Sequence, residues 1–326
     1  MNRPPLYGAI DLGGTSVRAI VADLDGRVYG EEIRPSETER GPDAVFQRLA
    51  ETLEAAASAA GGRPADLRGV GICSPGTIDV ERGVVSGAPQ LPGWEDVPLV
   101  RIMSERLGVS VWLDNDASAA ALGEHTFGAG RGSRHMLYIT VSTGIGGGII
   151  IHRKLYRGAA GSAGELGHIV VDINGPRCGC GSSGCLEALA SGTAIARQGE
   201  ELLAKGESPR LAALRGRQGR VTAEMVAQAA TAGDEACRRL FAEAGRYIGA
   251  ALASYVNIFN PEVIIVGGGV ARSAELFLPQ AERTMRERAM AEPLKHVRLA
   301  LSALGERVGP LGMIARLSEA AREKPA

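Results

Sequence analysis

Long apolar runs and a large net charge are both missing from this chain of 326 residues. Lys and Arg total 36 and Asp and Glu total 37, so the formal net charge is −1. A chain with this balance has no overall basic field to attract nucleic acid or an anionic membrane. The N-terminal stretch has no apolar segment typical of a signal peptide, and no apolar run exceeds the length of a strand. We therefore expect a cytoplasmic protein without a nucleic-acid or membrane partner.

Aromatic residues are also scarce, at 4%, whereas glycine is abundant, with 45 residues. This composition favours ligand sites built from close backbone turns over sites built from aromatic platforms. Only five cysteines are present. The chain is long enough for two domains, and neither a low-complexity segment nor a long run of like charge interrupts it.

Three of the five cysteines lie in one segment, residues 161–187. Cys178, Cys180 and Cys185 supply three thiolates, and His168 can supply an imidazole nitrogen. These four donors make a complete tetrahedral set for a structural zinc ion, with no position left for water. Two alternatives are ordinary buried cysteines and a disulfide that leaves one thiol unpaired. The scarcity of cysteine elsewhere favours zinc.

Two glutamates flank this metal set without belonging to it, Glu165 and Glu187. A zinc ion on one nitrogen of His168 would fix the direction of the other nitrogen. Polar groups held rigidly around a metal anchor indicate a site for a hydroxyl-rich ligand.

The segment 11–15 joins two predicted strands, 7–10 and 17–22. It contains Asp11 followed by Gly13 and Gly14. Glycines bring backbone N–H groups close to phosphate oxygens, and a carboxylate can hold Mg²⁺. The segment therefore indicates a phosphate-and-magnesium site, with a simple hairpin turn as the alternative.

A strand that runs into a glycine turn occurs twice more in the chain. A predicted strand over 136–142 leads into a glycine turn at 143–148 and a second strand at 149–152. A buried strand over 263–266 runs into Gly267–Gly269, where a flat ring such as adenine could lie against the backbone. A predicted helix over 272–290 follows. The repetition indicates a duplicated architecture with a nucleotide between the two halves.

A polar trio, residues 114–116, separates a predicted strand at 109–113 from an alanine-rich helix. Helix capping would need only one of the three residues, so we expect a functional role for Asn115 and Asp116. We interpret Cys73 as a small buried hydrophobe. The remaining predicted elements are helices over 44–60, 97–107, 191–205, 221–232, 235–258 and 310–321, strands over 69–73 and 299–302, and a loop at 88–94.

Eight motifs together resemble the sugar-kinase branch of the ROK family (repressor, open reading frame, kinase). They are DLGGT at 11–15, PGTID at 75–79, LPGW at 91–94, DNDASAAALGE at 114–124, STGIGGGII at 142–150, GELGH at 164–168, CGCGSSGCLE at 178–187 and IIVGGGV at 264–270. The resemblance implies an actin-like, ribonuclease-H-like ATPase fold with two α/β lobes and a cleft between them. We place the lobes at 1–117, completed by about 305–326, and at 118–304 with the zinc site.

The resemblance also implies phosphorylation of a hexose hydroxyl with ATP and Mg²⁺, with Asp116 as the base. The implied sugar-binding residues are Gly76, Gln90, Asn115, Glu165, His168 and Glu187. The implied nucleotide-facing residues are Asp11, Gly13, Gly14, Thr15, Thr143, Gly144 and Gly268.

The preferred reaction is conversion of glucose to glucose 6-phosphate. N-acetylglucosamine, N-acetylmannosamine and fructose are alternative substrates, because Gln90 and Ser118 replace asparagines that are common in the family. A sugar-responsive repressor is disfavoured, since the first glycine turn at Asp11 leaves no room for an upstream DNA-reading domain. A non-catalytic sugar-binding regulator is disfavoured by the presence of both Asp11 and Asp116. The family resemblance also implies a homo-oligomer, a dimer or tetramer.

Overall fold

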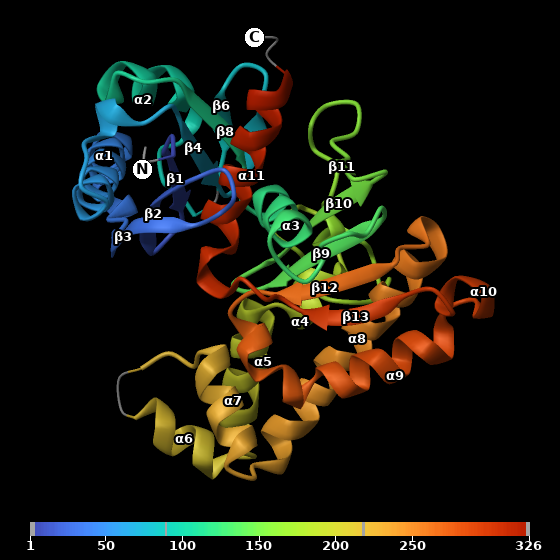
Figure 1. Cartoon of the computed structure of the whole chain (residues 1–326). Coiled ribbons are helices and arrows are strands. Elements are labelled where there is room, and N and C mark those ends of the chain that lie inside the picture. Colours follow the sequence, from blue (N-terminus) through green and yellow to red (C-terminus); the bar gives the residue numbers. More distant parts are fainter. Residues whose placement is uncertain (1–3, 89, 217–218, 324–326) are drawn as a thin grey trace. The chain divides into compact units, whose positions relative to one another are not determined.

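The protein is described here by a computed structural model that covers residues 4–88, 90–216 and 219–323. It contains two compact units (Figure 1). The first comprises residues 1–132, 148–164 and 303–326, and the second comprises 133–147 and 165–302. The lobe boundaries expected from the sequence stay a prediction. Pro89 of the loop at 88–94 and both ends of the chain lie outside the described residues.

The first unit contains a five-stranded sheet with the order β3-β2-β1-β4-β8. Its strands β1, β4 and β8 are parallel, whereas β2 and β3 continue from β1 as an antiparallel meander. The elements of this unit are β1 (Tyr7–Leu12), β2 (Ser16–Ala22), β3 (Val28–Pro35), α1 (Pro42–Ala59), β4 (Val70–Ser74), β5 (Thr77–Asp79), β6 (Val84–Gly87), β7 (Glu95–Val97), α2 (Leu99–Leu107), β8 (Val111–Asn115), α3 (Asp116–Thr126), β11 (Lys154–Leu155) and α11 (Val308–Glu323), with short 3₁₀ turns at Thr38–Arg40, Pro64–Asp66 and Gly305–Arg307.

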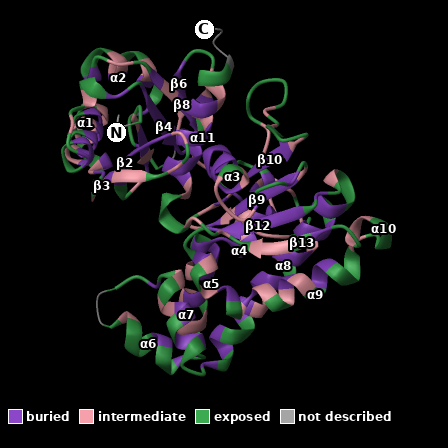
Figure 2. Ribbon diagram, viewed as in Figure 1, coloured by how far each residue is buried: buried purple, intermediate pink, exposed green. Residues whose placement is uncertain are grey.

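Two apolar clusters cover the two faces of this sheet, because successive side chains of a strand point to opposite faces. Ile10 of β1 belongs to the cluster that includes α1 and α2, whereas its neighbour Ala9 belongs to the cluster that includes α3 and α11. Cys73 is fully buried in the second cluster, as expected for a small hydrophobe. Figure 2 shows the helices buried along one side and exposed along the other.

Strand β3 and a small antiparallel sheet, β5-β6-β7, were not expected from the sequence. The strands of the small sheet have three or four residues each, too few to show a clear alternation of polar and apolar side chains. Strand β5 lies within the motif at 75–79, and β7 directly follows the motif at 91–94.

The second sheet has the order β11-β10-β9-β12-β13, and the division between the units falls within β10. Strands β9, β12 and β13 are parallel, and β10 and β11 pair as an antiparallel hairpin. The first sheet has the same combination of three parallel strands and two antiparallel ones. The elements are β9 (Met136–Val141), β10 (Ile145–Ile151), α4 (Leu186–Ala190), α5 (Gly192–Ala204), α6 (Pro209–Arg215), α7 (Ala223–Thr231), α8 (Glu235–Phe259), β12 (Val263–Gly267), α9 (Leu278–Arg288), α10 (Ala291–Leu294) and β13 (Arg298–Leu301), with 3₁₀ turns at Leu166–His168 and Val270–Leu276.

The expected glycine turn over 143–148 was too long. Only residues 142–144 form the turn, and β10 already begins at Ile145. Gly148 lies within that strand. A Cβ at this position would come within 2.5 Å of Ala121 Cβ and 2.9 Å of Ala117 O, so a larger residue would not fit. Its glycine therefore allows the strand to pass close to α3, a reason that the local sequence does not reveal.

The single helix expected over 272–290 was also wrong. A 3₁₀ segment over Val270–Leu276 has non-helical angles at Ser273, and α9 starts only at Leu278. Pro279 occupies the first turn of α9, where its missing N–H leaves no helical hydrogen bond unmade. The proline therefore marks the start of a helix and not its interior.

Within the described ranges, no helix is both long enough and apolar enough to cross a membrane.

One fully buried carboxylate, Glu124 of α3, binds backbone N–H groups in the first unit. Its oxygens accept hydrogen bonds from Ala129 N at 2.8 Å, Ala303 N at 2.9 Å and Leu304 N at 3.0 Å. Buried backbone donors need such partners because water does not reach them.

We predict that Glu124→Ala lowers the free energy of unfolding by about 3 kcal/mol, because it leaves these donors without a charged acceptor. Urea unfolding followed by circular dichroism measures the change. Glu282→Ala is the control: Glu282 pairs with Arg286 on the surface of α9 and its loss should change little. Equal effects of the two variants would contradict the structural role of Glu124.

Candidate active site

The polar trio lies where β8 ends and α3 begins. Asn115 is the N-cap of α3: its Oδ1 accepts hydrogen bonds from Ala117 N at 3.0 Å and Ser118 N at 3.2 Å. The capping alternative is therefore confirmed for Asn115, while its role toward a sugar stays a prediction. The half-buried Asp116 accepts a hydrogen bond from Ala117 N at 2.8 Å. A helix N-terminus favours the charged form of such a carboxylate.

Gly76 lies next to this capping residue. Its carbonyl accepts a hydrogen bond from Asn115 Nδ2 at 3.4 Å. Its φ of 95° and the 2.2 Å between a Cβ at this position and Gly87 O exclude any larger residue. The turn after β4 and the start of α3 therefore form one hydrogen-bonded arrangement in the first unit.

The first glycine turn has hairpin geometry, with Gly13 N donating to Ser16 O at 2.9 Å. The hairpin alternative is therefore confirmed for this turn, and its role toward phosphate stays a prediction. Gln90 lies directly against this turn, with its Cβ 3.2 Å from the Cβ position at Gly14. The structure thus brings a residue predicted to reach the sugar beside one predicted to face the nucleotide.

Asp11 is the penultimate residue of β1, just before this turn. Burial raises the pKa of its carboxyl group, although Cys73 Sγ donates a hydrogen bond to its Oδ1 at 3.4 Å. A cation beside a buried carboxylate would favour the charged form and oppose this effect. The Mg²⁺-binding role of Asp11 stays a prediction.

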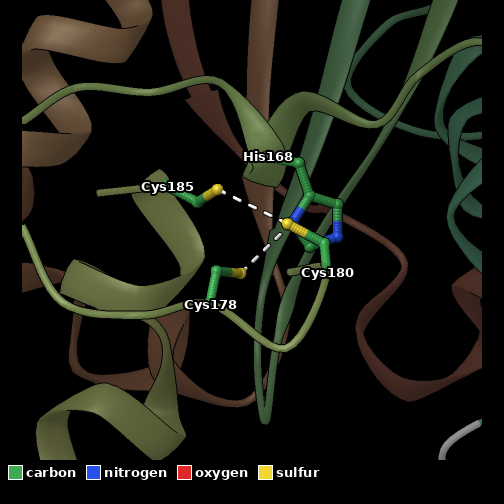
Figure 3. A group of neighbouring side chains, drawn as sticks. All are labelled: His168, Cys178, Cys180 and Cys185. Atoms are coloured by element: carbon green, nitrogen blue, oxygen red, sulfur yellow. Dashed lines mark hydrogen bonds between the residues drawn. The ribbon is translucent and has the colours of Figure 1, made fainter. Parts of the chain in front are cut away.

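In the second unit, the structure brings the four predicted zinc ligands together (Figure 3). Their donor atoms all lie within 4.8 Å of one another. Cys178 Sγ is 3.6 Å from His168 Nδ1, and Cys180 Sγ is 3.7 Å from Cys185 Sγ. Sulfurs at this separation are not bonded, so the disulfide alternative is wrong for these cysteines. Three sulfurs and one nitrogen fit Zn²⁺ by type and number.

The second nitrogen of His168 points toward a predicted sugar ligand. His168 Nε2 is 3.9 Å from Glu165 Oε2, and the Glu165 side chain is 67% exposed. A zinc ion on Nδ1 would leave Nε2 directed at this carboxylate. The metal set and the exposed polar pair are therefore parts of one arrangement.

Glu187, at the start of α4, connects the cysteine cluster with the second glycine turn. Its Oε2 accepts a hydrogen bond from Ile145 N at 2.9 Å, and Cys178 Sγ is 3.8 Å from its Oε1. A Cβ at Gly144 would lie only 2.4 Å from Glu187 Oε2, so the turn packs directly on the carboxylate.

Two residues that the sequence analysis missed hold this turn in place. Gly192 N donates to Ser142 O at 2.7 Å, and both the amide and the hydroxyl of Thr193 donate to Thr143 O, at 3.2 and 2.8 Å. The run of small residues Ser191-Gly192-Thr193 at the start of a predicted helix could have indicated them. The third glycine junction lies beside the same turn, because a Cβ at Gly268 would be 2.4 Å from Val141 O.

The predicted site residues thus form two sets, one in each unit. The first unit carries Asp11, Gly13, Gly14, Thr15, Gly76, Gln90, Asn115 and Asp116, and the second carries Thr143, Gly144, Glu165, His168, Cys178, Cys180, Cys185, Glu187 and Gly268.

Comparison with known proteins agrees with the motifs. The model of the ROK family matches residues 7–320. This chain belongs to the ROK family. A glucokinase of Thermotoga maritima is 38% identical over 310 residues, which are 95% of this chain and 96% of that relative.

Other ROK proteins show both the shared fold and the functional range of the family. A ROK glucokinase from Streptomyces griseus, solved in complex with glucose and AMPPNP, has a TM-score of 0.84 and 35% identity, covering 96% of this chain and 98% of that one. The expected actin-like fold with two α/β lobes is confirmed. A xylose repressor of Caldicellulosiruptor bescii is 34% identical over 94% of this chain and 76% of its own length.

For this ROK protein we predict that zinc copurifies with the chain and that Cys180→Ser removes most of it. Losing one of four ligands opens the coordination sphere to water. Elemental analysis after gel filtration measures the metal. Cys237→Ser, which changes a buried cysteine outside the cluster, is the matched control and should keep its zinc. Full zinc content in the Cys180 variant would contradict the assignment.

Proposed function

We propose that this protein is an ATP-dependent hexose kinase that converts glucose to glucose 6-phosphate. The observation that carries the proposal is Asp116, a half-buried carboxylate at the first position of α3. Similarity to glucokinases over nearly the whole chain supports the substrate class. A ROK glucokinase that binds glucose and AMPPNP supports ATP as phosphoryl donor.

Asp116 would accept the proton of the sugar hydroxyl as the oxygen attacks the γ-phosphorus. Phosphoryl transfer depends mainly on positioning and charge neutralisation, and a general base adds to this. The hydrogen bond from Ala117 N orients the carboxylate, while the N-terminus of α3 favours its ionised state. The carboxylate is therefore held in one orientation at the start of the helix, as a general base requires.

The polar residues of the second unit would hold the other sugar hydroxyls. Glu165 and His168 offer an acceptor and a ring nitrogen close to each other, and Glu187 is fixed by the amide of Ile145. Zn²⁺ on the three cysteines and His168 would serve as a structural anchor. Asn115, Gly76 and Gln90 complete the proposed sugar contacts.

The glycine turns would bind the nucleotide. Backbone N–H groups at Gly14 and Gly144 would approach phosphate oxygens, and Gly13, Thr15, Thr143 and Gly268 belong to the same turns. Asp11 would hold Mg²⁺, which supplies positive charge against the transferred phosphoryl group. A cytoplasmic location and a dimeric or tetrameric assembly are part of the same proposal.

A repressor is the second candidate, because a xylose repressor shares 34% identity with this chain. The two candidates differ in turnover. A repressor needs to bind its sugar, whereas a kinase must consume ATP in a sugar-dependent way. ADP release with and without glucose therefore separates them.

We predict that Asp116→Asn lowers kcat by about 10²–10⁴-fold, because the amide accepts no proton in the transition state. Glucose binding, measured by calorimetry, should change little since the amide keeps the shape of the side chain. Asp25→Asn, in an exposed turn of the same unit, should leave kcat unchanged. Near-normal turnover of the Asp116 variant would reject the proposed base.

A panel of sugars tests the substrate. We expect the highest kcat/KM for glucose over N-acetylglucosamine, N-acetylmannosamine, fructose, mannose and allose, read by coupled ADP release. Gln90→Asn, which restores the residue common in the family, should change the ranking without abolishing turnover. A higher kcat/KM for an N-acetylhexosamine in the wild type would reject glucose while keeping the reaction class.

A further inference from the structure

Asp114, the residue before the capping Asn115, is a fully buried carboxylate at the end of β8. Both its oxygens accept hydrogen bonds from one guanidinium: Arg157 Nη1 to Oδ1 at 2.9 Å and Arg157 Nη2 to Oδ2 at 2.6 Å. The Asp114 side chain is 1% exposed and that of Arg157 is 28% exposed. Such a bidentate pair fixes orientation as well as charge. The pair also raises the pKa of Arg157, so the cation persists.

A short chain of hydrogen bonds leads from this pair to the proposed base. Asp114 Oδ1 accepts a hydrogen bond from the backbone N of Asn115 at 2.9 Å. Asn115 in turn caps α3 through Ala117 N, the same amide that binds Asp116 Oδ1. The backbone that carries Asp116 is therefore held from its N-terminal side by Asp114 and from its C-terminal side by the first turn of α3.

The positive charge of Arg157 also lies in a region rich in carboxylates. Burial raises the pKa of the Cys73 thiol well above its ordinary value, and the charges of Asp11, Asp116 and Asp114 add to that rise. Like charges near one another repel more strongly in a region of low polarity. The guanidinium of Arg157 bonds to the fully buried one of the three.

Arg157 also begins an exposed loop that follows β11. Its carbonyl accepts a hydrogen bond from Ala163 N at 3.1 Å, which closes the loop on itself. Gly158 and Gly161 take positive φ angles of 69° and 78° within it. Along the chain, the loop leads directly to Glu165, a proposed sugar ligand.

We propose that Arg157 is a positioning residue for phosphoryl transfer. Its two hydrogen bonds to Asp114 fix the backbone at Asn115 and so orient the carboxylate of Asp116. The inference rests on the proposed role of Asp116 as base. Arg157 itself touches no reacting atom in this scheme, and its effect passes through Asp114.

Steady-state kinetics of three variants test the proposal. Arg157→Met should lower kcat with glucose and ATP about 10–100-fold, since misplacement of a base affects the transition state. The KM for ATP should change less than about threefold, whereas the KM for glucose should rise because Asn115 is also a proposed sugar contact. Arg157→Lys keeps the charge without the two-pronged geometry and should recover only part of kcat. Arg101→Met, on the exposed surface of α2, is the matched control and should behave as wild type.

The double variant Arg157→Met/Asp114→Asn separates positioning from stability. Arg157→Met alone leaves a buried carboxylate without its cation, so its melting temperature should fall. Removing the buried charge in the double variant should restore most of the melting temperature. The kcat should stay low because the two hydrogen bonds from Arg157 that hold this segment are still lost.

Wild-type kcat in Arg157→Met, or recovery of wild-type kcat in the double variant, would overturn the positioning role. Failure of the proposed function looks different: the wild-type protein itself would then phosphorylate no sugar, and the inference would fall with it.

Discussion

Parallel strand pairing is the constraint on which the candidate site depends. Asp11, Cys73 and Asp114 are neighbours on β1, β4 and β8 of the first sheet. Because parallel strands all end at the same edge, the turns that follow them also gather there. In the second sheet, Thr140 of β9 pairs with Gly267 of β12, so the turns after those two strands are neighbours as well. Each sheet thus collects segments that are far apart in the chain.

Buried carboxylates stabilise the segments around these strand ends. Asp114 is paired with Arg157, and Glu124 accepts three backbone hydrogen bonds. The half-buried Glu187 accepts one from Ile145 and also lies near Cys178. A buried charge is tolerated only with such partners, so each carboxylate selects one local arrangement of the backbone around it. Rigid positioning of this kind is what a phosphoryl-transfer site requires.

The ROK fold supports both catalysis and regulation, so membership of the family does not by itself decide the activity. The relatives of this chain include a glucokinase and a xylose repressor at similar identity, 38% and 34%. The features that argue for catalysis are local: an oriented carboxylate at the start of α3 and a half-buried carboxylate, Asp11, next to the last residue of β1. The cysteine cluster argues only for a rigid support.

The sequence alone determined the features that depend on residue type and short spacing. The cysteines and His168 were predicted to form one metal-ligand set, because few other arrangements explain three thiols in eight residues, and their donor atoms do lie together. The glycine turns and the start of α3 were also predicted, since the signals for turns and caps are local. Tertiary structure decided the rest. Arg157 and Asp114 are 43 residues apart, and only the fold brings them together. Gly148 has no room for a side chain because α3 packs closely against its strand. The residues next to it in the sequence give no sign of this contact.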